Sequence, residues 1–188
     1  MATNMKTTIV IVLACVCTSS FSHAQGTVNF ANAGAGINAP VHIDTIGGTL
    51  AGAGYMAQLF LVEGGGSLTP VGNVATFVGA AAPGYFNGGV VTVNQVAPGV
   101  SATFQAFGWD SSLGATTYPA ALAAWNGGLI HGGYSAQATV VTGGAGTPAS
   151  PPAALPALQP WILVIVPEPS TALLALLGAG ALLIRRRY

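Results

Sequence analysis

The chain has almost no basic residues. Its 188 residues include only four Lys and Arg. All four lie at the chain ends, as Lys6, Arg185, Arg186 and Arg187. Residues 25–166 contain three acids (Asp44, Glu63 and Asp110), so this part has a formal charge of about −3. Binding to a phosphate backbone needs cations that displace counterions, and this composition therefore excludes a nucleic-acid partner.

The chain also has only two cysteines, Cys15 and Cys17. Both lie in an N-terminal segment in which one lysine precedes an apolar run and small polar residues follow, the layout of a secretory signal peptide. We predict a signal peptide over residues 1–24 that signal peptidase cuts between Ala24 and Gln25, which leaves the mature chain without thiols or disulfides. The alternative is a lipoprotein that keeps Cys15 as an acylated N-terminus.

Glycine is abundant, with 27 residues, and its clusters disfavour long helices. Between these clusters the apolar residues recur with a period near two, as strands require. We therefore predict one all-β domain over residues 25–166, an antiparallel β-sandwich or jelly roll. Its expected strands are 27–30, 41–44, 55–63, 71–78, 90–94, 100–109, 134–142 and 161–166.

One short helix is expected inside this domain. Pro119 suits its first position, residues 120–125 favour helix, and the glycines after Asn126 end it. Such a short helix needs packing, which we assign to Leu122 and Trp125. Residues 147–160 are rich in proline and predict an extended surface strap that leads into the final strand, 161–166.

The C-terminal residues 167–188 have a distinct organisation. Pro167, Glu168 and Pro169 precede an apolar run over residues 171–184. A helix over this run would rise about 21 Å, which is less than the thickness of a bilayer hydrocarbon core, about 30 Å. Local thinning of the bilayer and arginines that snorkel to its surface make up the difference. Arg185, Arg186 and Arg187 then form a cytoplasmic stop, with the domain before Pro167 outside.

This tail resembles the PEP-CTERM sorting signal of exported bacterial surface proteins, in which Pro167, Glu168 and Pro169 supply the motif. The resemblance implies export, an exosortase-like processing enzyme as partner, and release to the cell surface after processing. Hydropathy alone leaves an ordinary membrane anchor as an alternative. Segments of the glycine-rich domain also resemble an ectodomain type with no established activity, so no catalytic residue follows from the resemblance.

Residues that could carry catalysis are few. His42 and Asp44 stand two apart on an expected strand and would share one face, where an ion pair or a shared metal is geometrically possible. No third ligand lies within sequence reach, so we favour a surface pair at a strand end, and we predict no metal and no cofactor. A secreted hydrolase that uses His42, His131 or Asp110 is a distant alternative.

Aromatic residues near predicted turns support a different alternative. Tyr85, Trp109, Trp125 and Tyr134 could form a platform that stacks on the sugar rings of an extracellular polysaccharide. The simpler interpretation is that most of them fill the core. We therefore expect a protein that is not an enzyme, exported to the envelope, exopolysaccharide or biofilm matrix, with a carbohydrate-binding module as the first alternative.

Overall fold

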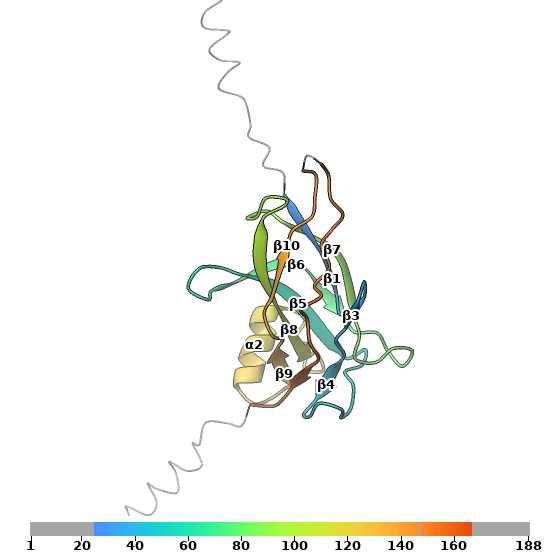
Figure 1. The fold of residues 1–188 in the computed structure, drawn as a ribbon. Helices are drawn as coiled ribbons and strands as arrows, with labels where there is room; N and C mark the ends of the chain where they lie inside the picture. The colour runs from blue at the N-terminus through green and yellow to red at the C-terminus, as the bar shows by residue number, and fades with distance from the viewer. Residues whose placement is uncertain (1–24, 147, 167–188) are drawn as a thin grey trace, which may run out of the picture.

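The computed structural model describes residues 25–146 and 148–166. The predicted signal peptide, residues 1–24, and the predicted membrane helix, 171–184, lie outside these residues. In the described part a single short helix accompanies many strands, which confirms the mostly-β class (Figure 1). The elements are β1 (Gly26–Ala31), β2 (Ala33–Gly34), β3 (Ile37–Asn38), β4 (Val41–Ile43), β5 (Tyr55–Val62), β6 (Leu68–Thr76), β7 (Asn87–Val93), β8 (Ser101–Asp110), α2 (Tyr118–Asn126), β9 (Gly132–Tyr134), β10 (Ala138–Val141) and β11 (Trp161–Leu163).

The largest sheet has the strand order β10-β8-β5-β6, and β9 pairs with the second half of β8. All of its pairs are antiparallel. β5 pairs with β8 along its whole length, from Tyr55 opposite Asp110 to Val62 opposite Thr103. β5 is therefore an interior strand, in keeping with the apolar side chains on both of its faces.

Three two-stranded sheets complete the fold: β1-β7 and β2-β3, which are antiparallel, and β4-β11, which is parallel. The expectation of a purely antiparallel fold is wrong at this last pair. Trp161 lies opposite Val41 and Leu163 opposite Ile43, so two segments far apart in the chain run side by side. A parallel pair needs a long crossover between its strands, and short-range patterns carry no sign of it.

Most predicted strands differ from the observed ones by one to three residues at an end, and two of the differences have a clear structural cause. The strand expected at 134–142 is divided into β9 and β10, because Ser135 interrupts the ladder beside β8. Its backbone N–H donates to the carbonyl of Ala106 and its Oγ accepts the N–H of the same residue, at 2.8 and 2.9 Å. The strand expected at 161–166 ends at Leu163, after which Val164 forms a single bridge to Gly132.

The main core lies between one face of the large sheet and the strands β1, β7, β4 and β11. Alternate residues of β5 and β8 point into it, including Leu59, Leu61 and Phe104. A second, smaller core lies on the opposite face of the same sheet, where Phe60 and Phe107 are covered by α2 and the chain that flanks it. The large sheet is thus covered fully on one side and partly on the other.

Helix α2 forms as predicted around Pro119, and its first residue is Tyr118. It ends where the N–H of Gly127 donates to the carbonyl of Ala123 at 3.1 Å. Ala121 is the fully buried residue of this helix, so the assignment of its packing to Leu122 is wrong, whereas Trp125 does pack in the second core. No helix among residues 25–146 and 148–166 is both long and apolar enough to cross a bilayer.

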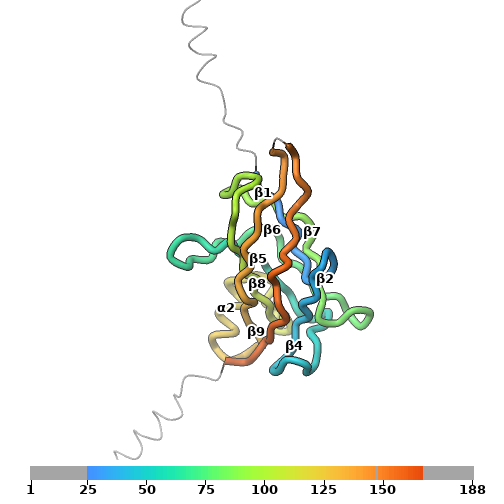
Figure 2. Tube along the Cα trace, in the orientation of Figure 1, coloured from blue at the N-terminus to red at the C-terminus, as the bar shows by residue number. Residues whose placement is uncertain are grey.

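The described part of the proline-rich stretch, 148–160, runs beside β1 (Figure 2). The carbonyl of Ala153 accepts the N–H of Asn29 at 2.7 Å. Leu155 and Leu158 are buried in the main core. This segment is therefore fastened to the domain on its way to β11.

Candidate functional site

The last described strand, β11, lies between two other strands. On one side it pairs in parallel with β4, and the N–H of Asp44 donates to the carbonyl of Leu163 at 2.9 Å. On the other side Val164 and Gly132 exchange two backbone hydrogen bonds of 3.0 Å each. The described chain ends shortly afterwards, at Val166 (Figure 2). The end of the described chain is therefore held by backbone hydrogen bonds from both neighbouring strands.

Side chains fix the same strand. Trp161 and Leu163 are buried in the main core, where the ring of Trp161 lies 6.1 Å from that of Phe86. The indole N–H of Trp125, on α2, donates to the carbonyl of Val164 at 2.8 Å. Position 133 requires glycine, because a Cβ there would collide with the carbonyl oxygen of Ile162.

Asp44 and His131 contact each other near the end of β11. His131 Nε2 lies 3.3 Å from Asp44 Oδ1, and the contact is ionic only when the histidine is protonated. Asp44 lies beyond the end of β4 with a left-handed φ of 63° and does not share a strand face with His42, so the two are not placed for the ion pair or shared metal that their spacing allowed. Nδ1 of His42 lies 3.3 Å from the carbonyl oxygen of Gly48 instead.

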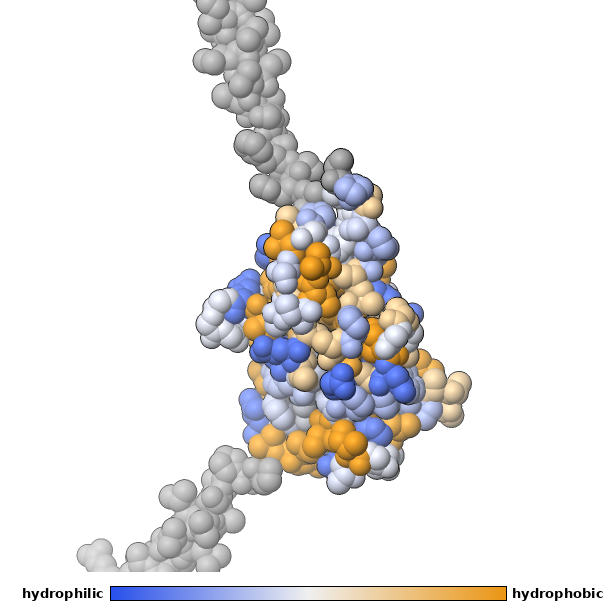
Figure 3. Space-filling view, viewed as in Figure 1, coloured by the Kyte–Doolittle hydropathy of each residue, from blue (hydrophilic) through white to orange (hydrophobic). Residues whose placement is uncertain are grey.

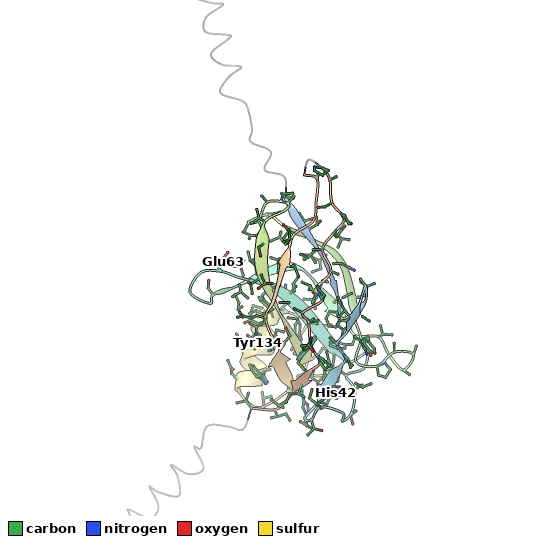
Figure 4. The ribbon with its side chains drawn as sticks, in the orientation of Figure 1. His42, Glu63 and Tyr134 are labelled. Carbon is green, nitrogen blue, oxygen red and sulfur yellow. The ribbon has the colours of Figure 1, made fainter. Side chains whose placement is uncertain are left out.

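The other candidate chemical groups are dispersed. Glu63 lies far from His42 (Figure 4). Among residues 25–146 and 148–166, no three His, Cys, Asp or Glu side chains come close enough to hold a metal ion. Asp110 Oδ1 accepts the N–H of Ser112 at 2.8 Å, which makes this acid part of the turn that follows β8.

The structure does not bring the four proposed platform aromatics together. Trp109 is fully buried, with its indole N–H bonded to the carbonyl of Ala115 at 2.6 Å, so it cannot stack on a sugar at the surface. Tyr85 belongs to another part of the domain and donates to Asn38 Oδ1 at 2.7 Å. Only Trp125 and Tyr134 are neighbours, with ring centroids 5.9 Å apart.

Tyr134 lies half-buried at the edge of the second core (Figure 4). Its ring is 4.5 Å from that of Phe107, and its hydroxyl lies 2.8 Å from the hydroxyl of Tyr118. Burial, and after it the hydrogen bond with Tyr118, raise the pKa of Tyr134 far above its usual value. The phenol therefore keeps its proton and acts as a structural hydrogen-bonding group.

A shallow groove of about 380 Å³, which local sequence patterns alone do not predict, lies beside the strands β5, β8 and β10 and has both polar and apolar lining residues. Its polar lining consists of Glu63, Gln95, Ser101, Thr103 and Thr139. The two threonine hydroxyls lie 2.8 Å apart across the β8-β10 pair. The alternation of Ser101 and Thr103 along one strand is a visible signal, but the register that places Thr139 opposite Thr103 is not.

Residues 166–187 match the family model of the PEP-CTERM protein-sorting motif. The chain carries this motif, so the resemblance based on Pro167, Glu168 and Pro169 is confirmed. The motif begins where the described domain ends, and it implies an exported, envelope-directed protein that an exosortase-type enzyme processes. No curated protein and no solved structure in the comparison matches the chain.

Proposed function

We propose that this chain is a non-enzymatic structural protein of the cell envelope, exopolysaccharide or biofilm matrix. In this proposal the leader over residues 1–24 is removed, the domain over 25–166 is exported, and the helix over 171–184 holds it in the membrane until processing. The observation that carries the proposal is the sorting motif at residues 166–187, directly behind the fastened strand β11.

The distribution of ionisable groups supports a non-enzymatic role. Acid–base and nucleophilic catalysis need several polar groups within hydrogen-bond reach of one reacting centre. In the described part of the chain, Asp44, His131 and Asp110 lie at one end of the domain, where Asp110 accepts a hydrogen bond within a turn, and Glu63 lies in a different region. We also assign the core packing to a β-sandwich, with the large sheet as one layer and β1, β7, β4 and β11 as the other.

The mass of the protein in its native envelope tests the processing step. We expect a mature chain that begins at Gln25 and has lost Arg185, Arg186 and Arg187. Replacement of both motif prolines (Pro167→Ala with Pro169→Ala) should leave the arginines attached. The matched control is Pro160→Ala, at an exposed proline just outside the motif, which should be processed normally. Intact arginines in the unaltered protein would contradict processing and leave a plain membrane anchor.

Carbohydrate binding remains the second candidate, now at the shallow groove instead of the aromatic platform. The observation that favours it is the set of hydroxyl and amide side chains in this groove, where Glu63 is the one charged group and no cation is present, which suits a neutral sugar polymer better than an anionic one. Glycan-array binding by the purified protein is the test. Thr103→Val together with Thr139→Val should abolish any signal, whereas Thr92→Val, at an exposed threonine on β7, should not. An array without any binding by the unaltered protein would remove this candidate.

A further inference from the structure

The exposed leucines and isoleucines of the described residues gather at one end of the domain. Four such side chains have a large exposed fraction: Ile46 at 62%, Leu113 at 62%, Leu129 at 64% and Ile165 at 44%. We call this set the exit surface. Figure 3 shows hydrophobic residues gathered at the end of the molecule where the described chain stops. Exposed apolar groups concentrated in one region mark a contact surface more often than scattered ones do.

The strand pairings place all four on the same end. Ile46 lies in the loop after β4, and Ile165 lies after β11, which runs parallel to β4. Leu129 lies just before β9, whose first residue bridges Val164 beyond β11. Leu113 follows β8, and the end of β8 meets the start of β9, where the N–H of Asp110 donates to the carbonyl of His131 at 2.9 Å.

The exposed valines are distributed differently. Val100 and Val141 lie at the opposite end, where β10 pairs with the first residues of β8, and Val90 lies within β7. Val78 follows β6, close to the start of β5. The larger side chains are thus concentrated where the described chain ends, while the smaller ones are spread over several regions.

We propose that the exit surface rests on the lipid bilayer that holds the C-terminal segment. The proposal depends on the membrane-held state of the proposed function. Only five peptide steps separate Val166 from Thr171, where the apolar run begins, and an extended chain covers about 18 Å in that length. The polar interface of a bilayer is several ångströms thick on each side of its hydrocarbon core, so the exit surface is kept within reach of the lipid.

The charges of this end specify the kind of lipid surface. Basic residues, which draw proteins to anionic lipids, are absent from residues 25–166. The ionisable groups close to the exit surface are Asp44, Asp110, His131, His42 and Tyr55, and Asp44 and His131 form the pair described above. Anionic headgroups would repel the two acids. Contact therefore depends on burial of the apolar side chains in a zwitterionic interface, with no gain from anionic lipid.

Site-specific fluorescent probes on the full chain test this contact. Single cysteines at Ile46, Leu113 and Leu129 would carry an environment-sensitive dye, in a chain whose Cys15 and Cys17 are replaced by serine. Matched controls are Val141→Cys and Val100→Cys, at comparably exposed positions on the opposite end. Ile165 is left out because its neighbour Val166 opens the sorting motif, and a probe there would report any anchored tail.

The protein would be reconstituted into phosphatidylcholine vesicles that contain a lipid with a quencher near its headgroup. We expect dyes at the three test positions to be quenched at least threefold more strongly than the dyes at the controls, with blue-shifted emission. Addition of phosphatidylglycerol should not increase the quenching. Equal quenching at test and control positions would overturn the proposal, as would quenching that rises with protein density, which would indicate a second copy as the occupant.

Two further readouts separate this proposal from the one on which it rests. Retention of the chain in vesicles after alkaline extraction reports the membrane-held state. Trypsin can cut only after Lys6 and at Arg185, Arg186 and Arg187, so the loss of the C-terminal arginines reports which side of the membrane they occupy. Extraction of the chain from the vesicles would contradict both proposals. Retention with equal quenching at all positions would contradict the lipid contact alone.

Discussion

Replacement of Asn32 should destabilise the fold more than replacement of any exposed polar residue. Asn32 is fully buried beside β1. Its Nδ2 donates to the carbonyls of Ala39 and Gly84, each at 2.8 Å, and its Oδ1 accepts the N–H of Phe86 at 2.7 Å. One side chain thus satisfies three buried backbone groups on two separate segments, one at Ala39 and one at Gly84 and Phe86.

The size of the effect follows from these three bonds. Each hydrogen bond contributes about 1 kcal/mol net, and a buried group left without a partner costs about 1–3 kcal/mol. Asn32→Ala should therefore lower the free energy of unfolding by about 3 kcal/mol, which corresponds to a drop in Tm of roughly 6–12 °C for a chain of this size. Asn32→Asp should cost more, because a carboxylate would face two carbonyl oxygens without a proton to donate.

Urea denaturation followed by tryptophan fluorescence measures these changes. The matched control is Asn73→Ala on β6, where the side chain is exposed and the change should stay within about 0.5 kcal/mol. If Asn32→Ala falls within 1 kcal/mol of that control, or if Asn32→Asp is as stable as the parent, then Asn32 does not connect these segments in the way described.

Two further predictions concern the region around β11. Gly133→Ala should lower the free energy of unfolding by about 1–3 kcal/mol because the new Cβ meets the backbone of Ile162. The control Gly64→Ala adds a Cβ in open space and should leave this free energy unchanged. Urea denaturation measures both variants, and equal stabilities would refute the clash. The raised pKa of Tyr134 means that its contribution to stability is present below about pH 10 and lost as the pH rises further. Tyr134→Phe should lower the free energy of unfolding by about 1 kcal/mol at pH 8, because the hydrogen bond to Tyr118 is lost. Between pH 8 and 11 the free energy of unfolding of this variant should fall less steeply than that of the parent. Parallel pH profiles would contradict this assignment.

Local patterns predicted the class of this fold and several of its elements. The alternation of apolar residues located β5 and β8, and Pro119 with the glycines after Asn126 located α2. These signals are short-range, and each element could be recognised from its own residues. Sequence patterns also identified the sorting motif, because its order of proline, acid, apolar run and arginines lies in one continuous segment.

Features that depend on distant partners could not be predicted in this way. The pair of Asp44 with His131 needs β4 and β9 to flank the same strand, and no local spacing indicates that. Asn32 resembles an ordinary turn residue until its partners at Ala39, Gly84 and Phe86 are known. Glycine and turn residues around Trp109 suggest a surface position, but β8 carries this side chain into the second core.

The insertion of β11 between β4 and β9 constrains the order in which this domain matures. A chain that crosses a membrane from its N-terminus presents β4 early and β11 almost last. Trp161 and Leu163 complete the main core, so the layer that contains β4 stays open until the final part of the domain has crossed. Pairing between such distant segments is intrinsically slow. In a chain exported from its N-terminus, the domain can complete its core only when the sorting segment at residues 166–187 is the next part to cross.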